Sequence, residues 1–318
     1  MTKDPKTVYR YRAFSATTMD ILCHDDVYFS NPKSFNDPLD CNPTLENDSP
    51  IEDLRKLLAS MIARRVETEV LHNLQQAHVK GIQATEYVKE QAHSEAVNGL
   101  KEIAYSATDP SYGLKTEEAE SWRLVEIIKH ELDQHYERGV CCFSTTYKNP
   151  LLWSHYGDEH QGICIGYGLE RNPKPTISKV VYGGSRSIKT SKLIAALLEK
   201  SAEAKKDLDR DILLRKASGW RYEREWRIIG ERGIQPSPLL LKEVVFGLRC
   251  KNSIIHTVIK ALSGRTNNMK FFKIFPVSGS YRLRREELDA EDLDRNLPNT
   301  AMSGIEIFGD VLGEKSTK

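Results

Sequence analysis

The hydrophobic periodicity of the sequence changes twice, near Pro50 and near Gly139, and these changes constrain its fold more than any other feature. Outside these limits, short runs alternate apolar and polar residues, a pattern typical of strands with one buried face. Between them, apolar residues such as Leu54, Leu57 and Leu58 recur every three or four positions, which indicates helices. The sequence therefore predicts an α+β fold in which a helical segment interrupts a sheet-based core.

The predicted domains follow from these two changes. Residues 1–49 and 139–280 are expected to form the core, residues 50–138 a large helical insertion, and residues 281–318 a charged C-terminal extension. The expected helices lie at residues 17–23, 51–74, 84–104, 116–137, 150–156, 189–216 and 251–262. The expected strands lie at residues 8–14, 27–30, 139–146, 162–167, 180–182, 220–229, 239–246 and 270–275.

Composition narrows the class of protein. Lysine and arginine (46) balance aspartate and glutamate (45), so net charge gives no argument for nucleic-acid binding. No apolar run is long enough to span a membrane and the N-terminus lacks a signal-peptide core, so we expect a cytoplasmic protein with no membrane partner. The six cysteines show no CxxC and no metal-ligand spacing, so we expect reduced thiols and no zinc site.

The stretch Trp220–Ile229 carries the most informative pattern of charges. Apolar and charged side chains alternate, which predicts a strand that places Glu223 and Glu225 on one face. Their α-carbons would lie about 6.6 Å apart, close enough for two carboxylates to serve one reaction centre. The alternative is a solvated strand whose carboxylates pair with the neighbouring arginines Arg221, Arg224 and Arg227. We expect this pair to be half exposed and to contribute little to stability.

Several catalytic motifs are absent or incomplete. His155 and His160 are five residues apart, whereas the zinc-protease helix needs a spacing of four. There is no phosphate-binding GxxxxGK[ST] loop, and Ser144 lacks the GxSxG context of a serine hydrolase. Cys142 lies in an apolar run typical of a strand, which disfavours a nucleophilic thiolate there.

Three features occur in a set order along the chain: an arginine on the first strand, the run Ser144-Thr145-Thr146, and the pair Glu223-x-Glu225. This order resembles the Arg, Ser-Thr-Ser and Glu-x-Glu arrangement of ADP-ribosyltransferases. The resemblance implies an ADP-ribosyltransferase-like two-sheet core that holds NAD in a cleft. The chain departs from that pattern in reading Ser-Thr-Thr and in its large helical insertion, which would be a lid, an acceptor platform or a partner surface.

The chain more closely resembles a widespread bacterial family of unknown function. The shared motifs are YxYR at Tyr9–Arg12, FNDPxD at Phe35–Asp40, CFS at Cys142–Ser144, WSHY at Trp153–Tyr156, HxGIC at His160–Cys164 and YExEW at Tyr222–Trp226. This resemblance spans residues 8–247.

The resemblance to ADP-ribosyltransferases implies a role for each candidate site residue. Glu225 would stabilise the oxocarbenium-like state formed as the nicotinamide bond breaks, and Glu223 would orient or deprotonate the acceptor. Arg12, with Arg10, would hold the ribose or pyrophosphate by a forked contact. The other residues expected to bind NAD are Tyr28, Ser30, Asn36, Asp37, Ser144, Thr145, Trp153, His155 and Tyr156.

The leading hypothesis is an NAD-dependent ADP-ribosyltransferase that modifies an intracellular protein, DNA or RNA, as a toxin or an anti-phage defence effector. NAD would be its substrate, and no bound metal is expected. One alternative is a catalytically silent module that binds a nucleotide or a partner and assembles, as a homo-oligomer or with another protein, through the helical insertion. Another is a metal-dependent hydrolase or nuclease that uses the same carboxylates.

Overall fold

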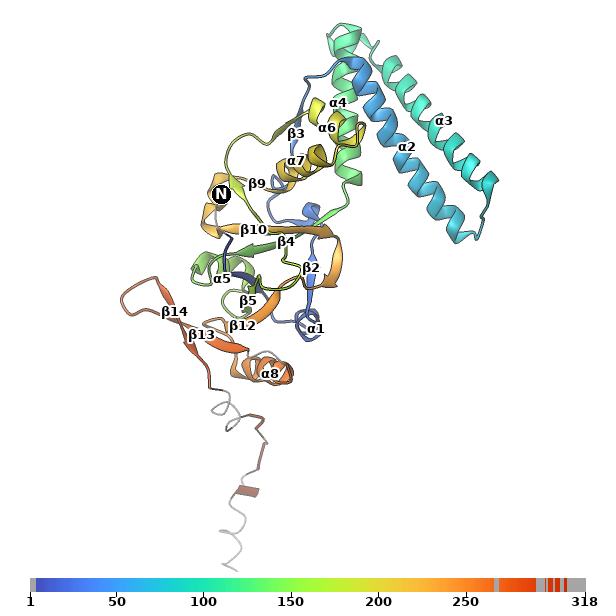
Figure 1. Ribbon diagram of the computed structural model, residues 1–318. Helices are drawn as coiled ribbons and strands as arrows, with labels where there is room; N and C mark the ends of the chain where they lie inside the picture. Colours follow the sequence, from blue (N-terminus) through green and yellow to red (C-terminus); the bar gives the residue numbers. More distant parts are fainter. Residues whose placement is uncertain are drawn as a thin grey trace, which may run out of the picture. The chain divides into compact units, whose positions relative to one another are not determined.

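The computed structural model describes residues 4–265, 269–289, 295, 297–299, 301–303 and 306–307. The chain divides into two units (Figure 1). The first comprises the chain up to Val27, Phe143–Pro175 and the chain from Pro236 on, and the second comprises Tyr28–Cys142 and Thr176–Gln235. The strands that contain residues of both units are β2 (Asp26–Phe29), β4 (Arg138–Ser144) and β11 (Gly233–Pro236).

The first unit is built on a mixed sheet. Its elements are β1 (Thr7–Arg12), α1 (Ala16–His24), α5 (Pro150–Tyr156), β5 (Ile163–Gly168), β12 (Leu240–Phe246), α8 (Asn252–Leu262), β13 (Lys270–Pro276) and β14 (Leu283–Glu287). Strand β5 pairs antiparallel with β1 and with β12, so that Tyr11 lies opposite Cys164 and Phe246 opposite Ile163. Strand β13 is parallel to β12 because α8 connects them and returns the chain to the same end of the sheet.

Close packing in this unit explains one glycine. All six residues of β5 are buried, as expected for a strand that has a neighbour on each side and both faces covered. Gly247 follows β12, and a Cβ added there would lie 2.1 Å from the carbonyl oxygen of His160. Glycine at this position therefore permits the close approach of the two backbone segments.

The second unit contains the helices expected between residues 50 and 138. Helices α2 (Ile51–Gln76) and α3 (Ile82–Ser106) lie side by side as an antiparallel hairpin, and α4 (Thr116–His135) packs on α2 (Figure 1). The remaining elements are η1 (Pro32–Ser34), β3 (Thr44–Glu46), η2 (Pro110–Tyr112), β6 (Ser178–Lys179), β7 (Val181–Tyr182), β8 (Ser187–Lys189), α6 (Thr190–Leu197), α7 (Ala202–Leu213), β9 (Arg215–Lys216), η3 (Ser218–Glu223) and β10 (Glu225–Glu231). The core of this unit joins α2 and α4 to α6 and α7 through buried aliphatic side chains that include Leu57, Ile128, Leu193 and Leu213.

The architecture has a mixed sheet and a helical region, which confirms the α+β class predicted from the sequence. The unit boundaries fall elsewhere than the predicted domain limits, because the helices share a unit with residues 28–49 and 176–235. Strand β14 lies within the predicted C-terminal extension, residues 281–318, and pairs antiparallel with β13. Residues 290–294, 296, 300, 304–305 and 308–318 of that extension lie outside the described residues.

The single helix expected over residues 189–216 is wrong. The chain breaks between α6 and α7, where Lys200 has a left-handed φ of 55°. Ser201 then caps α7, because its hydroxyl accepts a hydrogen bond of 3.2 Å from the backbone N–H of Ala204. After α7 the chain forms β9, which pairs in parallel with β7, so Lys216 lies on a strand and not at a helix end.

Candidate functional site

The stretch Trp220–Ile229 does not form one continuous strand, so the predicted alternation of its side chains is wrong. It begins within the 3-10 helix η3, after which Arg224 adopts a left-handed conformation with φ 50° and ψ 48°. Strand β10 starts only at Glu225. The chain therefore turns between Glu223 and Glu225, yet both carboxylates contact one ammonium group, that of Lys216.

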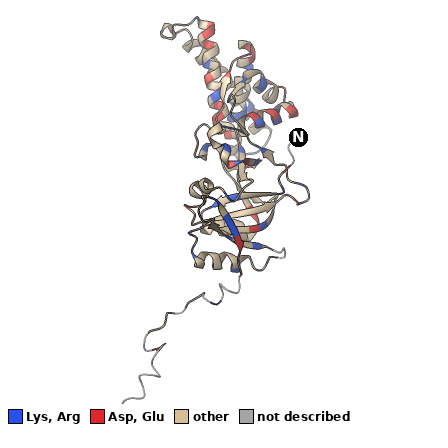
Figure 2. Ribbon diagram, turned by 90° about the vertical axis from the view of Figure 1, so that its left-hand side faces the viewer, with Lys and Arg blue, Asp and Glu red and all other residues tan. Residues whose placement is uncertain are grey.

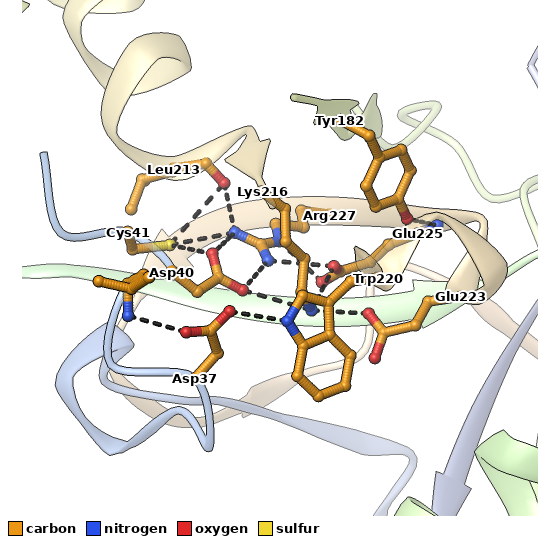
Figure 3. Close-up of polar contacts among 11 residues, drawn as sticks. Asp37, Asp40, Cys41, Tyr182, Leu213, Lys216, Trp220, Glu223, Glu225 and Arg227 are labelled. Atoms are coloured by element: carbon orange, nitrogen blue, oxygen red, sulfur yellow. Dashed lines mark hydrogen bonds and ion pairs between the residues drawn. The ribbon is translucent and has the colours of Figure 1, made fainter. Parts of the chain in front are cut away.

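Five ionisable side chains form a buried charge cluster in the second unit (Figure 3). They are Asp40, Lys216, Glu223, Glu225 and Arg227, each at most 8% exposed. The ammonium nitrogen of Lys216 lies 2.6 Å from Glu223, 3.1 Å from Glu225 and 3.3 Å from Asp40. Asp40 and Arg227 are 187 positions apart in the sequence, so tertiary folding assembles the cluster.

Arg227 joins carboxylates from two distant parts of the chain. Its Nε and Nη2 donate to Glu225 at 2.7 and 3.0 Å, while its Nη1 and Nη2 donate to Asp40 at 3.0 and 2.6 Å. Nη1 also donates to the backbone carbonyl of Leu213 at 2.7 Å. The guanidinium therefore makes two forked contacts, which the single ammonium of a lysine could not reproduce.

Two thiols and a phenol complete the surroundings of the cluster. Nη1 of Arg227 lies 3.0 Å from Sγ of Cys41, and the Cys142 thiol hydrogen-bonds Glu225. Burial raises the pKa of both thiols, which makes them neutral neighbours and poor nucleophiles. The backbone N–H of Glu225 donates to the hydroxyl of Tyr182 at 2.7 Å, which fixes the start of β10.

The cations determine the ionisation of Glu225. Burial alone would raise the pKa of Glu225, but the charges of Arg227 and Lys216 outweigh burial and lower that pKa to about 2. Burial lowers the pKa of Lys216 and of Arg227, yet the neighbouring carboxylates keep both values above the ordinary range. When all five groups are ionised, three carboxylates and two cations leave one excess negative charge in the cluster. Such a cluster places fixed carboxylates in a site of low dielectric, where they can stabilise a developing positive charge.

Trp220 packs over the ammonium of Lys216. Its indole N–H donates to Asp37 at 2.7 Å, and the nitrogen of Lys216 lies 5.1 Å from the indole ring centroid (Figure 3). Ala217–Gly219, just before the tryptophan, are exposed. Residues 217–224, named the cover segment below, therefore lie between the cluster and solvent on this side.

A cavity of about 370 Å³ lies next to the cluster in the second unit. Asp37, Asp40 and Cys41 contribute to its wall. The rest of the wall comes from η1 and the loop that follows it, the C-terminal ends of α4 and α7, and Arg232. A polar ligand in this cavity would contact Asp40, which in turn contacts Lys216 and Arg227.

The predicted arginines lie on β1 in the first unit. The register places Tyr9 opposite Ser144, so the side chains of these two residues share one face of the sheet. Arg10 projects from the other face, where its guanidinium carbon lies 5.9 Å from the ring centroid of Phe143. Arg10 is buried and Arg12, at the end of the strand, is partly exposed. Sheet geometry therefore places the two arginines on one face of the sheet and Ser144 on the other.

Helix α5 carries three of the other predicted residues. Trp153 is fully buried, donates its indole N–H to the carbonyl of Tyr147 at 2.8 Å and packs edge-on against Tyr11. It therefore belongs to the core of the first unit. His155 is exposed and Tyr156 is partly exposed, and their ring centroids lie 6.1 Å apart.

The remaining predicted residues occupy varied positions. Tyr28 on β2 is 40% exposed, and Asn36 is also exposed. Ser30 exchanges backbone hydrogen bonds with Val140, and Thr145, just after β4, is partly exposed. Among the predicted NAD-binding residues of the second unit, Asp37 is joined to the cluster through Trp220.

Three members of the cluster are not among the residues predicted from sequence. Asp40 had a signal, since it is the last residue of the FNDPxD motif, and Arg227 follows the YExEW motif directly. Lys216 had none, because its pattern indicated the end of a long helix. The alternative expectation of a solvated strand named Arg227 as one of three arginines that pair with the two carboxylates. Arg227 does pair with Glu225, but in the interior and not in water.

Residues 152–228 match the model of a family described as Protein of unknown function (DUF2971). The expected resemblance to a family of unknown function is thereby confirmed over this segment. The segment contains Lys216, Glu223, Glu225 and Arg227, four of the five members of the charge cluster. No curated protein and no solved structure matches the chain.

Within residues 4–265, 269–289 and the short described pieces beyond, no three or more His, Cys, Asp or Glu side chains are grouped so that they could hold a metal ion. In the same part of the chain, no helix has the length and apolarity needed to cross a bilayer.

Proposed function

We propose that the charge cluster is the catalytic centre of an NAD-dependent ADP-ribosyltransferase that modifies an intracellular macromolecule. The observation that carries this proposal is the buried carboxylate of Glu225, whose pKa of about 2 keeps it ionised at neutral pH. Breaking the bond between nicotinamide and ribose builds positive charge on the ribose, as in glycoside cleavage. A fixed carboxylate in a site of low dielectric stabilises that charge more strongly than a carboxylate in water does.

The pKa of Glu225 also separates the roles of the two glutamates. A carboxylate with a pKa of about 2 is a weak general base near neutral pH, so Glu225 acts through its charge. Glu223 is the last residue of η3 and lies within the cover segment, where it accepts from Lys216 at 2.6 Å. Movement of this segment would carry Glu223 toward an acceptor, which suits the acceptor-activating role.

The charge of the cluster is complementary to the reacting end of NAD. The carboxylate of Glu225 would favour the oxocarbenium-like ribose in the transition state, where positive charge grows next to it. The core would then be ADP-ribosyltransferase-like, and the protein would act as a toxin or an anti-phage defence effector.

The proposal requires the cover segment to move, since Glu223 and Glu225 are each 4% exposed. The segment is short, and two of its side chains connect it to the cluster and its surroundings. Trp220 attaches it to Asp37, and Glu223 attaches it to Lys216. A ligand that displaces the indole from Lys216 would expose the carboxylates from this side.

A second candidate is the catalytically silent module. The observation in its favour is that the cations of the cluster already occupy its carboxylates, as in a structural ion network. In that case the cavity beside Asp40 would bind a nucleotide or partner without chemistry, and the helical region would mediate assembly.

The test is mass spectrometry of cell extract incubated with the purified protein and isotope-labelled NAD. The transferase predicts a labelled ADP-ribose adduct on protein, DNA or RNA together with released nicotinamide, both unchanged by EDTA. Activity that EDTA abolishes and magnesium restores would favour the metal-dependent hydrolase or nuclease. Intact NAD and unmodified extract would contradict the transferase and support the silent module.

A further inference from the structure

Helix α3 uses one face within the second unit. Its buried side chains, Val88, Ala92, Ala96 and Ile103, recur at helical spacing, and the helix packs on α2. The opposite face is exposed along the whole helix. Three large apolar side chains on this helix are exposed: Ile82 to 80%, Tyr87 to 50% and Tyr105 to 82%. Three such residues on one helix are more than the scattered exposure that a surface normally shows.

The charges on the exposed face of α3 are arranged in a particular order. Glu86 and Glu90 lie in the first half of the helix and Lys101 in the second, with the small residue Ser94 between them. At 100° per residue, Tyr87, Glu90, Ser94 and Lys101 fall on one stripe opposite the buried side chains. A stripe that is acidic at one end and basic at the other is complementary to an antiparallel copy of itself.

We propose that α3 is a homodimer interface, in which it pairs antiparallel with α3 of a second copy of this chain about a two-fold axis near Ser94. Residues equally distant from the axis then face each other. Lys101 faces Tyr87 of the partner subunit and lies between Glu86 of the partner subunit and Glu90 of the partner subunit. Tyr105 faces Gln83 of the partner subunit.

This arrangement uses the exposed groups of α3 in compatible pairs. Each Lys101 has two carboxylates and an aromatic ring within reach, and Tyr87 gains a cationic neighbour. Antiparallel pairing also places the positive end of each helix dipole next to the negative end of the other. Figure 2 shows both acidic and basic residues along the helices of this region.

The proposed dimer does not depend on the activity of the charge cluster. Its residues lie on α3, whereas the cluster is formed by β9, η3, β10 and Asp40. A result against the dimer would not contradict the transferase proposal. A result against the transferase would likewise not contradict the dimer.

The experiment is sedimentation velocity on the full chain over a range of concentrations. The wild type should show a monomer–dimer equilibrium, and Lys101→Glu should raise its dissociation constant by at least about tenfold, because like charges then face each other. The combined variant Glu86→Lys, Glu90→Lys, Lys101→Glu restores opposite charges and should recover most of the wild-type affinity. Glu102→Lys is the matched control, because residue 102 is exposed but lies off the stripe, and it should dimerise like the wild type.

Circular dichroism should show the same helix content for all four proteins, so that a change in affinity is not a change in folding. A wild type that stays monomeric at all concentrations would overturn the proposal and assign the face to a different partner. A wild-type dimer that Lys101→Glu leaves unchanged would also overturn it, since another surface would then form the dimer.

Discussion

Glu225 and Arg227 lie two residues apart on β10, and their side chains project from the same face into the interior of the second unit. The expectation that the glutamate pair is half exposed is wrong, since both carboxylates are 4% exposed. Burial changes the energetics of the pair. An exposed ion pair contributes little, whereas removal of one partner from a buried pair leaves an uncompensated charge in the interior.

We predict that Glu225→Gln lowers the free energy of unfolding by about 3–5 kcal/mol, because Arg227 and Lys216 lose their shared carboxylate. Urea unfolding at neutral pH followed by circular dichroism measures this change. Glu231→Gln, at the exposed end of the same strand, is the matched control and should stay within about 0.5 kcal/mol of the wild type. Equal stability of Glu225→Gln and wild type would mean that the ion pairs contribute nothing net.

The low pKa of Glu225 predicts a dependence of stability on pH. Its folded-state pKa of about 2 lies below the ordinary value of 4.5, so the folded state favours the ionised form. This contribution to stability is fully present above pH 4.5 and is lost as the pH falls toward 2. Between pH 5.5 and 3, the wild type should therefore lose more unfolding free energy than Glu225→Gln. Parallel pH profiles for the two proteins would show that Glu225 is not the titrating group.

The indole N–H of Trp220 donates a hydrogen bond to Asp37 and so helps to hold the cover segment. Trp220→Phe keeps an aromatic ring over Lys216 but removes the N–H donor, so we expect a loss of about 1–2 kcal/mol. Hydrogen exchange at residues 217–224 should also become faster. Trp122→Phe, on α4 and 47% exposed, is the control and should change neither quantity. Unchanged exchange in Trp220→Phe would mean that other contacts hold the segment closed.

At the scale of the element, the break between α6 and α7 depends on the cap at Ser201. Ser201→Ala removes the acceptor for the N–H of Ala204 and should cost about 1 kcal/mol, measured by thermal unfolding. Ser201→Asp keeps an acceptor and places a negative charge at the helix N-terminus, so it should retain the wild-type melting temperature. A lower melting temperature for Ser201→Asp than for Ser201→Ala would contradict this explanation of the break.

Hydrophobic spacing was sufficient to predict α2, α3, α4 and most of the strands, because their apolar residues follow one period over many positions. It failed where one residue changes the backbone direction. Nothing in the local pattern marks Arg224 or Lys200 as left-handed, since both are residues that rarely adopt that conformation. The serine cap at residue 201 was a readable signal within the region predicted as one helix.

At the scale of the whole molecule, the charge cluster shows why a site is harder to predict than a fold class. The Glu-x-Glu motif identified two of its five members from sequence. The other three depend on contacts between residues far apart in the chain, such as Asp40 with Arg227. Local charge patterns favoured solvated side chains, since most charged residues are exposed. Burial of all five follows from tertiary packing, which no short motif encodes.

The most direct test of the account is nicotinamide release from NAD by the wild type, Glu225→Gln and Glu223→Gln, at a temperature where circular dichroism shows all three folded. If Glu225 stabilises the developing positive charge, its variant should lose release and transfer by about a hundredfold or more. Glu223→Gln should keep slow release while transfer to the acceptor collapses, because water needs less activation than an ordered acceptor does. Two results would contradict the account: folded Glu225→Gln releases nicotinamide as fast as the wild type, or the wild type releases none. Either result would leave the cluster as a buried structural ion network.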